Sequence, residues 1–258
     1  MAISLHYKIS GEGIPFLFQH GLGAQLAQTQ SLLSGVKGVQ LISADCPGHG
    51  ATPLPNGQIL SFDYYVTELA KLLDELNIER AIFGGISMGA GIATQFAIRF
   101  PERVKALVLV RPAWLAEPNP DNLMILKEAA RYIGQVDGVE RFKQDETFQA
   151  IEASLPLAAK SILGVFGPQQ QSVIPLVLEQ MVSDCPFDDL EKLRKIKQPC
   201  LIFGNEDDPL HPWEMAQTIH QYLPNSQLEK VISRYVHNRQ HKMQVTELVN
   251  DFINQMTI

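Results

Sequence analysis

The pattern of hydrophobic and polar positions predicts buried strands that alternate with amphipathic helices. Short apolar runs, suited to buried strands, recur at 14–19, 39–44, 104–110 and 199–204, and in the first half of 80–99. Segments after these runs have the apolar spacing of a helix, at about 26–34, at 61–76 and in the second half of 80–99. Uniformly apolar strands that alternate with helices are typical of a mostly parallel, twisted sheet with helices on both faces.

The two ends of the chain extend this pattern. Residues 2–9 alternate polar and apolar positions and, with 14–19, predict a hairpin joined by the turn at 11–13. Near the other end we expect a helix at about 213–222, a strand at 227–232 and a loop at 233–240. A last amphipathic helix then buries four residues, Val245, Leu248, Val249 and Phe252.

The alternation breaks after Arg111. Residues 113–187 have helical periodicity interrupted by six prolines, and they contain no convincing strand. A single crossover between parallel strands needs far fewer residues than this. We therefore predict an inserted helical lid at 113–187 over the carboxyl edge of the sheet, with 1–112 and 188–258 forming the core; ordinary crossover helices are the alternative.

Composition and charge narrow the class of partner. The net charge is −7, and no block of Lys and Arg stands out, which argues against a nucleic-acid or anionic-membrane partner. No apolar run approaches the roughly 18 residues needed to span a bilayer. The three cysteines are far apart, so they predict neither a disulfide framework nor a metal site, and we expect a cytoplasmic protein without metal or cofactor. The sequence carries no sign of an oligomeric state.

The sequence Gly85-Ile-Ser-Met-Gly89 lies where a predicted strand turns directly into a predicted helix. Such a turn forces Ser87 into an unfavourable backbone conformation, at a cost of about 1–3 kcal/mol. The chain passes so close on either side that a Cβ atom at Gly85 or Gly89 would collide. Ser87 is left with an exposed hydroxyl at a helix N-terminus, which suits a nucleophile. A Gly-rich strand–helix turn without chemistry is the alternative.

A serine nucleophile needs a base and an acid, and later loops supply both residue types. In a doubly wound sheet the loops at the carboxyl ends of the strands converge on one crevice. Asp207 and Asp208 follow the strand at 199–204, while His237 and His241 follow the last predicted strand. The order Ser, Asp, His is that of the α/β-hydrolases.

Five motifs in this order resemble the α/β-hydrolase superfamily along nearly the whole chain outside the lid. They are His20-Gly-Leu-Gly23, Asp45-x-x-Gly-His-Gly50, the Ser87 motif, Gly204…Asp208-x-x-x-Pro212 and a late His. The resemblance implies the α/β-hydrolase fold and hydrolysis through an acyl-enzyme, with Ser87 as nucleophile. It also implies an oxyanion hole made by the backbone N–H groups of Leu22 and Met88.

The acid and the base each have two candidates. The family's Pro four residues beyond the acid selects Asp208, whereas its three-residue step from the Gly selects Asp207. We prefer Asp208. For the base we prefer His241, because Val245, Leu248 and Phe252 can pin it to the core, over His237 in the middle of the predicted loop; neither has the usual preceding Gly.

Other residues have weaker assignments. His49 is expected to brace its Gly-rich loop, and His20 to bond backbone near the oxyanion loop. Trp114 and Phe166 of the lid are candidate substrate-binding residues, although packing among lid helices is the alternative. Arg111 ends a strand beneath the lid, where it could meet a substrate carboxylate or pair with a lid acid.

Within this superfamily, the sequence most resembles carboxylesterase- and enol-lactonase-like enzymes, which act on small esters or lactones. Haloalkane dehalogenases carry Asp where Ser87 stands, and cofactor-free haloperoxidases usually have an aromatic residue where Leu22 stands. Carbon–carbon hydrolases usually have Asn and Trp where Ile86 and Lys242 stand. Carbon–carbon or thioester hydrolysis remains an alternative, as does a non-catalytic ligand receptor on the same fold.

Overall fold

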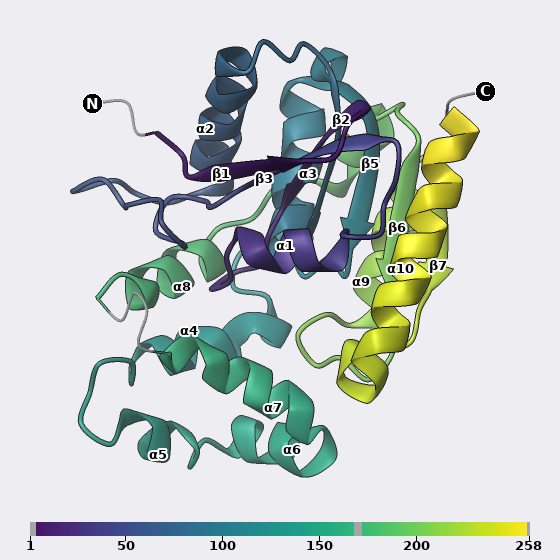
Figure 1. Ribbon diagram of the computed structural model, residues 1–258. Helices are drawn as coiled ribbons and strands as arrows, with labels where there is room; N and C mark the ends of the chain where they lie inside the picture. Colours follow the sequence, from purple (N-terminus) through teal and green to yellow (C-terminus); the bar gives the residue numbers. More distant parts are fainter. Residues whose placement is uncertain (1–3, 168–171, 257–258) are drawn as a thin grey trace.

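The computed structural model describes residues 4–167 and 172–256, and a seven-stranded sheet forms its centre (Figure 1). The strand order is β1-β3-β2-β4-β5-β6-β7, and every neighbouring pair is parallel except β1 with β3. The strands are β1 (Tyr7–Ser10), β2 (Ile14–Gln19), β3 (Val39–Ala44), β4 (Ala81–Ile86), β5 (Val104–Val110), β6 (Cys200–Gly204) and β7 (Ser226–Lys230). The expected fold class is confirmed.

Helices cover both faces of the sheet, because the central strands are apolar on both sides. On one face, Phe83 and Leu107 belong to a core with α2 (Phe62–Glu75), α3 (Met88–Arg99) and α9 (Trp213–Tyr222). On the other face, Ile82 and Val108 pack with α10 (Arg234–Met256) and with the residues that follow α1 (Leu26–Leu32). As expected, Ser61 caps α2, since its side chain accepts a hydrogen bond from the N–H of Tyr64.

The predicted hairpin at the N-terminus is wrong. The strand β1 begins at Tyr7 and pairs with β3, which lies between β1 and β2; residues 2 and 3 of the predicted strand lie outside the described part of the chain. Most of β1 is exposed, which suits an edge strand, whereas the apolar β2 is buried between two neighbours. The connection therefore crosses over the start of β3, where a Cβ atom at Gly11 would lie 2.5 Å from the Val39 carbonyl oxygen.

The predicted loop at 233–240 is also wrong, because α10 already begins at Arg234. His237 has non-helical φ and ψ of −145° and 82°, so a kink divides this helix into a short first turn and a long second part. Residues 234–240 are mostly polar, and the sequence contains no apolar period there that would indicate a helix. The consequence is that Arg234 and Tyr235 have fixed positions.

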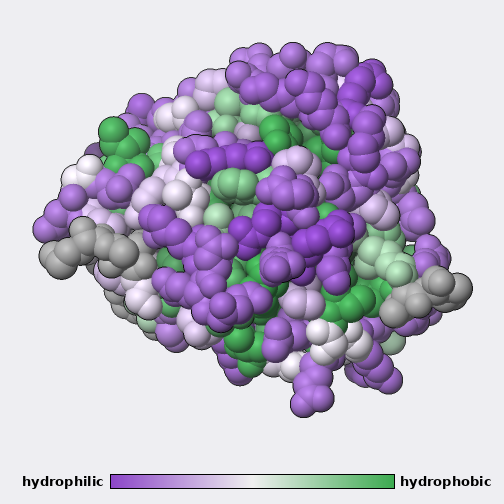
Figure 2. Space-filling model, turned by 90° about the horizontal axis from the view of Figure 1, so that it is seen from above, coloured by the Kyte–Doolittle hydropathy of each residue, from purple (hydrophilic) through white to green (hydrophobic). Residues whose placement is uncertain are grey.

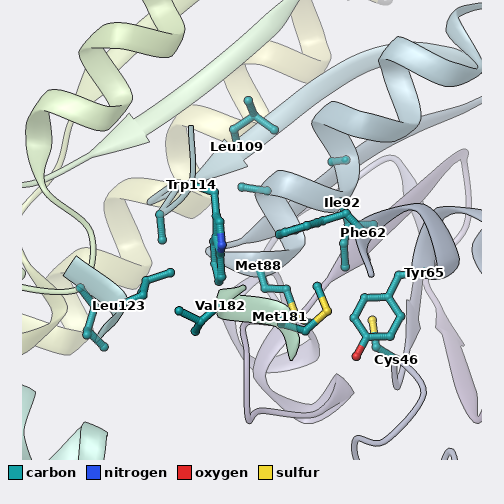
Figure 3. Packing of buried hydrophobic residues seen from close by; sticks show 14 of the residues in the cluster. Cys46, Phe62, Tyr65, Met88, Ile92, Leu109, Trp114, Leu123, Met181 and Val182 are labelled. Carbon is teal, nitrogen blue, oxygen red and sulfur yellow. The ribbon is translucent and has the colours of Figure 1, made fainter. Parts of the chain in front are cut away.

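Short helices lie between β5 and β6 on the carboxyl side of the sheet; we call residues 113–187 the lid segment (Figure 1). Its α-helices are α4 (Met124–Ala130), α5 (Gly138–Phe142), α6 (Glu146–Ser154), α7 (Pro156–Leu163) and α8 (Ile174–Val182). The last of them is tied to the start of α2: the N–H groups of Leu60 and Phe62 donate to Gln180 and Asp184. Met181 and Val182 of α8 also pack close to Trp114 (Figure 3).

Figure 2 shows a face that is mostly hydrophilic, with small scattered hydrophobic areas. Within residues 4–167 and 172–256, none of the helices combines the length and the apolar character that a bilayer crossing requires.

Candidate active site

Ser87 lies at the turn between β4 and α3 with φ of 57° and ψ of −112°, a strained conformation for a residue with a Cβ atom. The glycines beside it are required by close approach. A Cβ atom at Gly85 would lie 2.3 Å from the Gly89 backbone, and one at Gly89 would lie 2.3 Å from the carbonyl oxygen of Gln19. The side chain of Ser87 is almost buried, and it makes no hydrogen bond to another described residue. Its hydroxyl is therefore available to a ligand.

The loop after β2 is held by two buried histidines. His20 accepts from the N–H of Cys46 and donates to the Gly21 carbonyl, while His49 accepts from the N–H of Gly23. Burial lowers the pKa of both rings, so both are neutral at pH 7. The expected bracing roles of these histidines are confirmed.

This bracing leaves one N–H group of the loop unused. The N–H of Gly21 donates to Gln28 and that of Gly23 to His49, whereas the N–H of Leu22 has no acceptor among the described residues. The N–H of Met88 is likewise without an acceptor there, as expected at a helix N-terminus. Two backbone donors are thus left without an acceptor among the described residues, and an oxyanion hole needs such donors.

A small cavity of about 70 Å³ lies in front of Ser87. Leu22 contributes to its wall, and so do apolar residues of the lid segment, Leu123, Leu126, Ile162 and Val165. The polar and charged side chains on its wall are Gln28, Ser87, Arg111, Ser161, His211, Arg234 and Tyr235. The cavity therefore brings the expected nucleophile together with two arginines and with a histidine, His211, for which the sequence pattern offers no role.

The structure separates the two candidate acids. Asp207 is exposed, whereas the carboxylate of Asp208 is fully buried. One carboxylate oxygen of Asp208 lies 3.0 Å from the Arg111 guanidinium, and the other lies 2.8 Å from Nδ1 of His211. Burial opposes ionisation of this carboxyl, but the electrostatic interactions and hydrogen bonds with His211 and Arg111 outweigh it and hold the pKa of Asp208 well below its usual range. Asp208 is therefore an ionised carboxylate at neutral pH.

His211 has the geometry of a base that is oriented by an acid. Its Nδ1 faces Asp208, and its Nε2 has no hydrogen-bond partner among the described residues. Burial lowers the pKa of His211, although Asp208 counteracts this, so the imidazole is neutral at pH 7 and can accept a proton. Sequence analysis missed this residue. The spacing Asp208-x-x-His211, in a loop that leaves a sheet strand, is the signal that could have found it.

His241 occupies a different position. It is buried on α10, and its Nδ1 lies 2.8 Å from the carbonyl oxygen of Ile232 rather than next to Asp208. Burial and then the nearby charge of Arg111 lower the pKa of His241 to about 4. The side chain of His237 is exposed at the kink. The structure thus pairs Asp208 with His211, and it gives His241 a backbone carbonyl as its orienting acceptor.

The three candidate substrate-binding residues lie in different surroundings. Arg111, with φ of 50°, is on the cavity wall and forms its ion pair with Asp208 rather than with a lid acid. Trp114 is buried against Phe62, with ring centroids 5.4 Å apart, and it is not on the wall of this cavity (Figure 3). Phe166 is partly buried with its ring 5.2 Å from that of Phe142, and it too is absent from this wall. Of the three, only Arg111 faces Ser87's cavity.

A larger cavity of about 470 Å³ adjoins the first, since Gln28 and Val165 line both. Its described wall is formed by residues 23–25, 27 and 28, by Gly50 and by four lid residues, Gly164, Val165, Gly167 and Ile174. These described lining residues include no ionisable side chain. A small organic molecule needs more room than the inner cavity offers, so the outer one supplies space for the part that is not reacting.

Metal chemistry finds no support in the part of the chain that the structure describes. No group of three His, Cys, Asp or Glu residues there is arranged to hold a metal ion. The groups that the described residues present at this site are a hydroxyl, an imidazole–carboxylate pair, two arginines and backbone N–H donors.

The strained serine turn, the braced loop and the parallel sheet together define an α/β-hydrolase. The family model for the alpha/beta hydrolase fold matches residues 14–155, and the chain belongs to this family.

Its similarity to individual proteins extends over nearly its whole length. It is 28% identical to a 2-hydroxy-6-oxo-2,4-heptadienoate hydrolase of Pseudomonas putida, over 94% of this chain and 90% of that protein. It is 24% identical to a poly(3-hydroxyalkanoate) depolymerase of Ectopseudomonas oleovorans, over 93% and 84%. The crystal structure of an enol-lactonase from Burkholderia xenovorans LB400 superposes with a TM-score of 0.76 at 20% identity, over 98% and 97%. These relatives support the assignment of this chain as a hydrolase.

Proposed function

We propose that this protein is a serine hydrolase that cleaves a small carboxylic ester or lactone through an acyl-enzyme on Ser87. The observation that carries the proposal is the common cavity of Ser87 and His211, whose ring is hydrogen-bonded to the buried carboxylate of Asp208. Hydroxyl, imidazole and carboxylate are the three groups that nucleophilic serine catalysis requires.

In the proposed mechanism, Nε2 of His211 takes the proton of the Ser87 hydroxyl as the oxygen attacks the substrate carbonyl. The resulting oxyanion accepts hydrogen bonds from the N–H groups of Leu22 and Met88. When the tetrahedral intermediate collapses, the C–O bond of the ester breaks and the proton passes from His211 to the leaving alcohol. Water then repeats the same steps on the acyl-enzyme and releases the acid.

Two histidines compete for the role of base in this proposal. His241 is the residue that sequence analysis favours: its Nδ1 donates to the Ile232 carbonyl, and its Nε2 has no hydrogen-bond partner among the described residues. We assign the role to His211, because it shares the cavity with Ser87 and is oriented by an ionised carboxylate. In this assignment Asp208 keeps its predicted role as the acid, and Arg111 holds it in the ionised form.

The relatives support hydrolysis of more than one bond type. The depolymerase from Ectopseudomonas acts on a polyester, which favours the ester assignment. The heptadienoate hydrolase from Pseudomonas putida makes carbon–carbon hydrolysis the second candidate, since it aligns over 94% of this chain. A ligand receptor on the same fold is the candidate from another class, and the absence of a described hydrogen bond to the Ser87 hydroxyl favours it.

The test is hydrolysis of short p-nitrophenyl esters by the purified protein. The proposal predicts turnover that is abolished in Ser87→Ala and lowered by on the order of 10⁴ in His211→Ala. If His241→Ala is the variant with that loss, the base is assigned wrongly. A folded wild-type protein that is inert toward ester, thioester, lactone and dienoate substrates favours the receptor.

A further inference from the structure

The charges around the cavity of Ser87 do not balance. Two arginines, Arg111 and Arg234, line it, but Asp208 is the one carboxylate that pairs with either among the described residues. The histidines nearby are neutral at pH 7, since burial lowers the pKa of His211 and His241. Arg111 and Asp208 neutralise each other in their ion pair. The positive charge of Arg234 therefore has no ion-pair partner among the described residues.

Arg234 is held at the cavity wall by neutral contacts. It donates a 3.2 Å hydrogen bond from Nη2 to the hydroxyl of Ser161 on α7, and its guanidinium lies 5.0 Å from the centre of the Tyr235 ring. No described carboxylate lies within ion-pair distance of it. Burial, and after it the charge of Arg111, lower the pKa of Arg234. A partly buried cation without a counterion attracts an anion.

We propose that Arg234 binds a carboxylate group of the substrate, so that Ser87 acts on esters or lactones whose acyl part carries a free carboxylate. The guanidinium offers a planar pair of donors that matches a carboxylate. The site lies on the same small cavity as the Ser87 hydroxyl, so the anion and the reacting carbonyl belong to one compact acyl group. This inference rests on the proposed function.

The outer cavity indicates where the rest of the substrate lies. Among the described residues, its lining contains no ionisable side chain and several small residues, including Gly23, Ala24 and Gly164. The leaving alcohol, or the remainder of a lactone ring, is therefore expected to be neutral. The charged group and the neutral group of the substrate thus occupy separate parts of the site.

The experiment compares two substrates that differ only in charge: mono-p-nitrophenyl adipate and the same compound with its free carboxylate methylated. We expect kcat/KM of the wild-type protein to be roughly 10–100-fold higher for the anion, mainly because its KM is lower. This is the preference expected from one charge-assisted hydrogen-bond pair between Arg234 and the carboxylate. Arg234→Gln should abolish the preference and Arg234→Lys should keep part of it. Arg239→Gln, an exposed arginine on the same helix, is the matched control and should retain the preference.

A structural role for Arg234 is tested by Ser161→Ala. This variant removes the hydrogen bond between α10 and α7 but leaves the charge, so it should retain the preference for the anion. If Ser161→Ala loses the preference as Arg234→Gln does, the arginine acts by holding the lid segment, and the inference is wrong. Equal kcat/KM for the two substrates in the wild-type protein also overturns it and leaves the proposed function intact.

A binding measurement separates this inference from the proposed function. Titration of monomethyl adipate into Ser87→Ala should show binding that weakens at least tenfold in Ser87→Ala/Arg234→Gln and at high salt. If the wild-type protein hydrolyses neither p-nitrophenyl ester but Ser87→Ala binds monomethyl adipate in this way, the anion site is supported and the proposed function is wrong. Absence of binding, or binding that Arg234→Gln does not change, overturns the inference.

Discussion

The buried ring of His241 makes the stability of this protein depend on pH in a way that one substitution should remove. The pKa of His241 is lowered from 6.5 to about 4, first by burial and then by the charge of Arg111. In the unfolded chain the same ring titrates near 6.5, so between these pH values the unfolded state binds more protons. The free energy of unfolding therefore falls as the pH is lowered through this window.

The size of the effect follows from the shift in pKa. One pKa unit corresponds to about 1.4 kcal/mol. The lowered pKa of His241 therefore makes the free energy of unfolding fall by about 3 kcal/mol between pH 7 and pH 4. The variant His241→Asn keeps a side-chain N–H for the Ile232 carbonyl but cannot titrate. The other buried histidines are present in both proteins, so they cancel in the difference.

Urea unfolding at pH 7, 6, 5 and 4 at constant ionic strength measures the difference. We expect the curve of unfolding free energy against pH to be flatter in His241→Asn, by about 3 kcal/mol over this range. Parallel curves for the two proteins would show that His241 titrates alike when folded and unfolded, and would refute this reasoning.

Three further predictions concern the site and its support. Gly85→Ala places a Cβ atom 2.3 Å from the Gly89 backbone, so thermal or urea unfolding should show a loss of about 3 kcal/mol or more in the free energy of unfolding. The control Gly164→Ala should change this free energy little, because nothing lies within 4 Å of a Cβ atom there. Asp208→Asn leaves Arg111 buried without its counterion, so we expect stability to fall by roughly 3–5 kcal/mol and turnover to fall by about 10⁴. A variant as stable as the wild-type protein would contradict the buried ion pair. The lowered pKa of His211 predicts that kcat/KM falls on the acid side only below pH 6.5; an acid limb centred above that value would argue against a buried neutral base.

The sequence was sufficient to predict the sheet because its strands are encoded locally. Apolar runs such as 39–44 and 104–110 match β3 and β5. The Gly85-x-Ser-x-Gly89 pattern defines the turn between β4 and α3 through steric contacts within a few residues. The pairing of β1 was not predictable in this way. Whether an N-terminal strand pairs with its neighbour in sequence or with β3 depends on which strands are buried on both sides, which is a property of the whole sheet.

The site was predictable as far as its residues lie in patterned motifs. Ser87, Asp208 and the bracing histidines follow from motifs, whereas His211 and Arg234 were missed. Both lie in segments without periodicity, and their significance comes from long-range contacts: His211 through the buried carboxylate of Asp208, and Arg234 through a helix that the polar sequence 234–240 did not indicate. For Trp114 the sequence left two interpretations open, because a large aromatic residue after a strand suits a pocket and a core equally well, and in the structure it packs against Phe62.

The most direct test of the central claim, that Ser87 is a nucleophile activated by His211, is the rate at which a fluorophosphonate labels the protein, followed by intact and peptide mass spectrometry. The account predicts one label on Ser87, none on Ser87→Ala, and labelling slowed by at least about 10³ in His211→Ala but far less in His241→Asn. An unlabelled Ser87 in the folded wild-type protein, or labelling of His211→Ala at the wild-type rate, would contradict it.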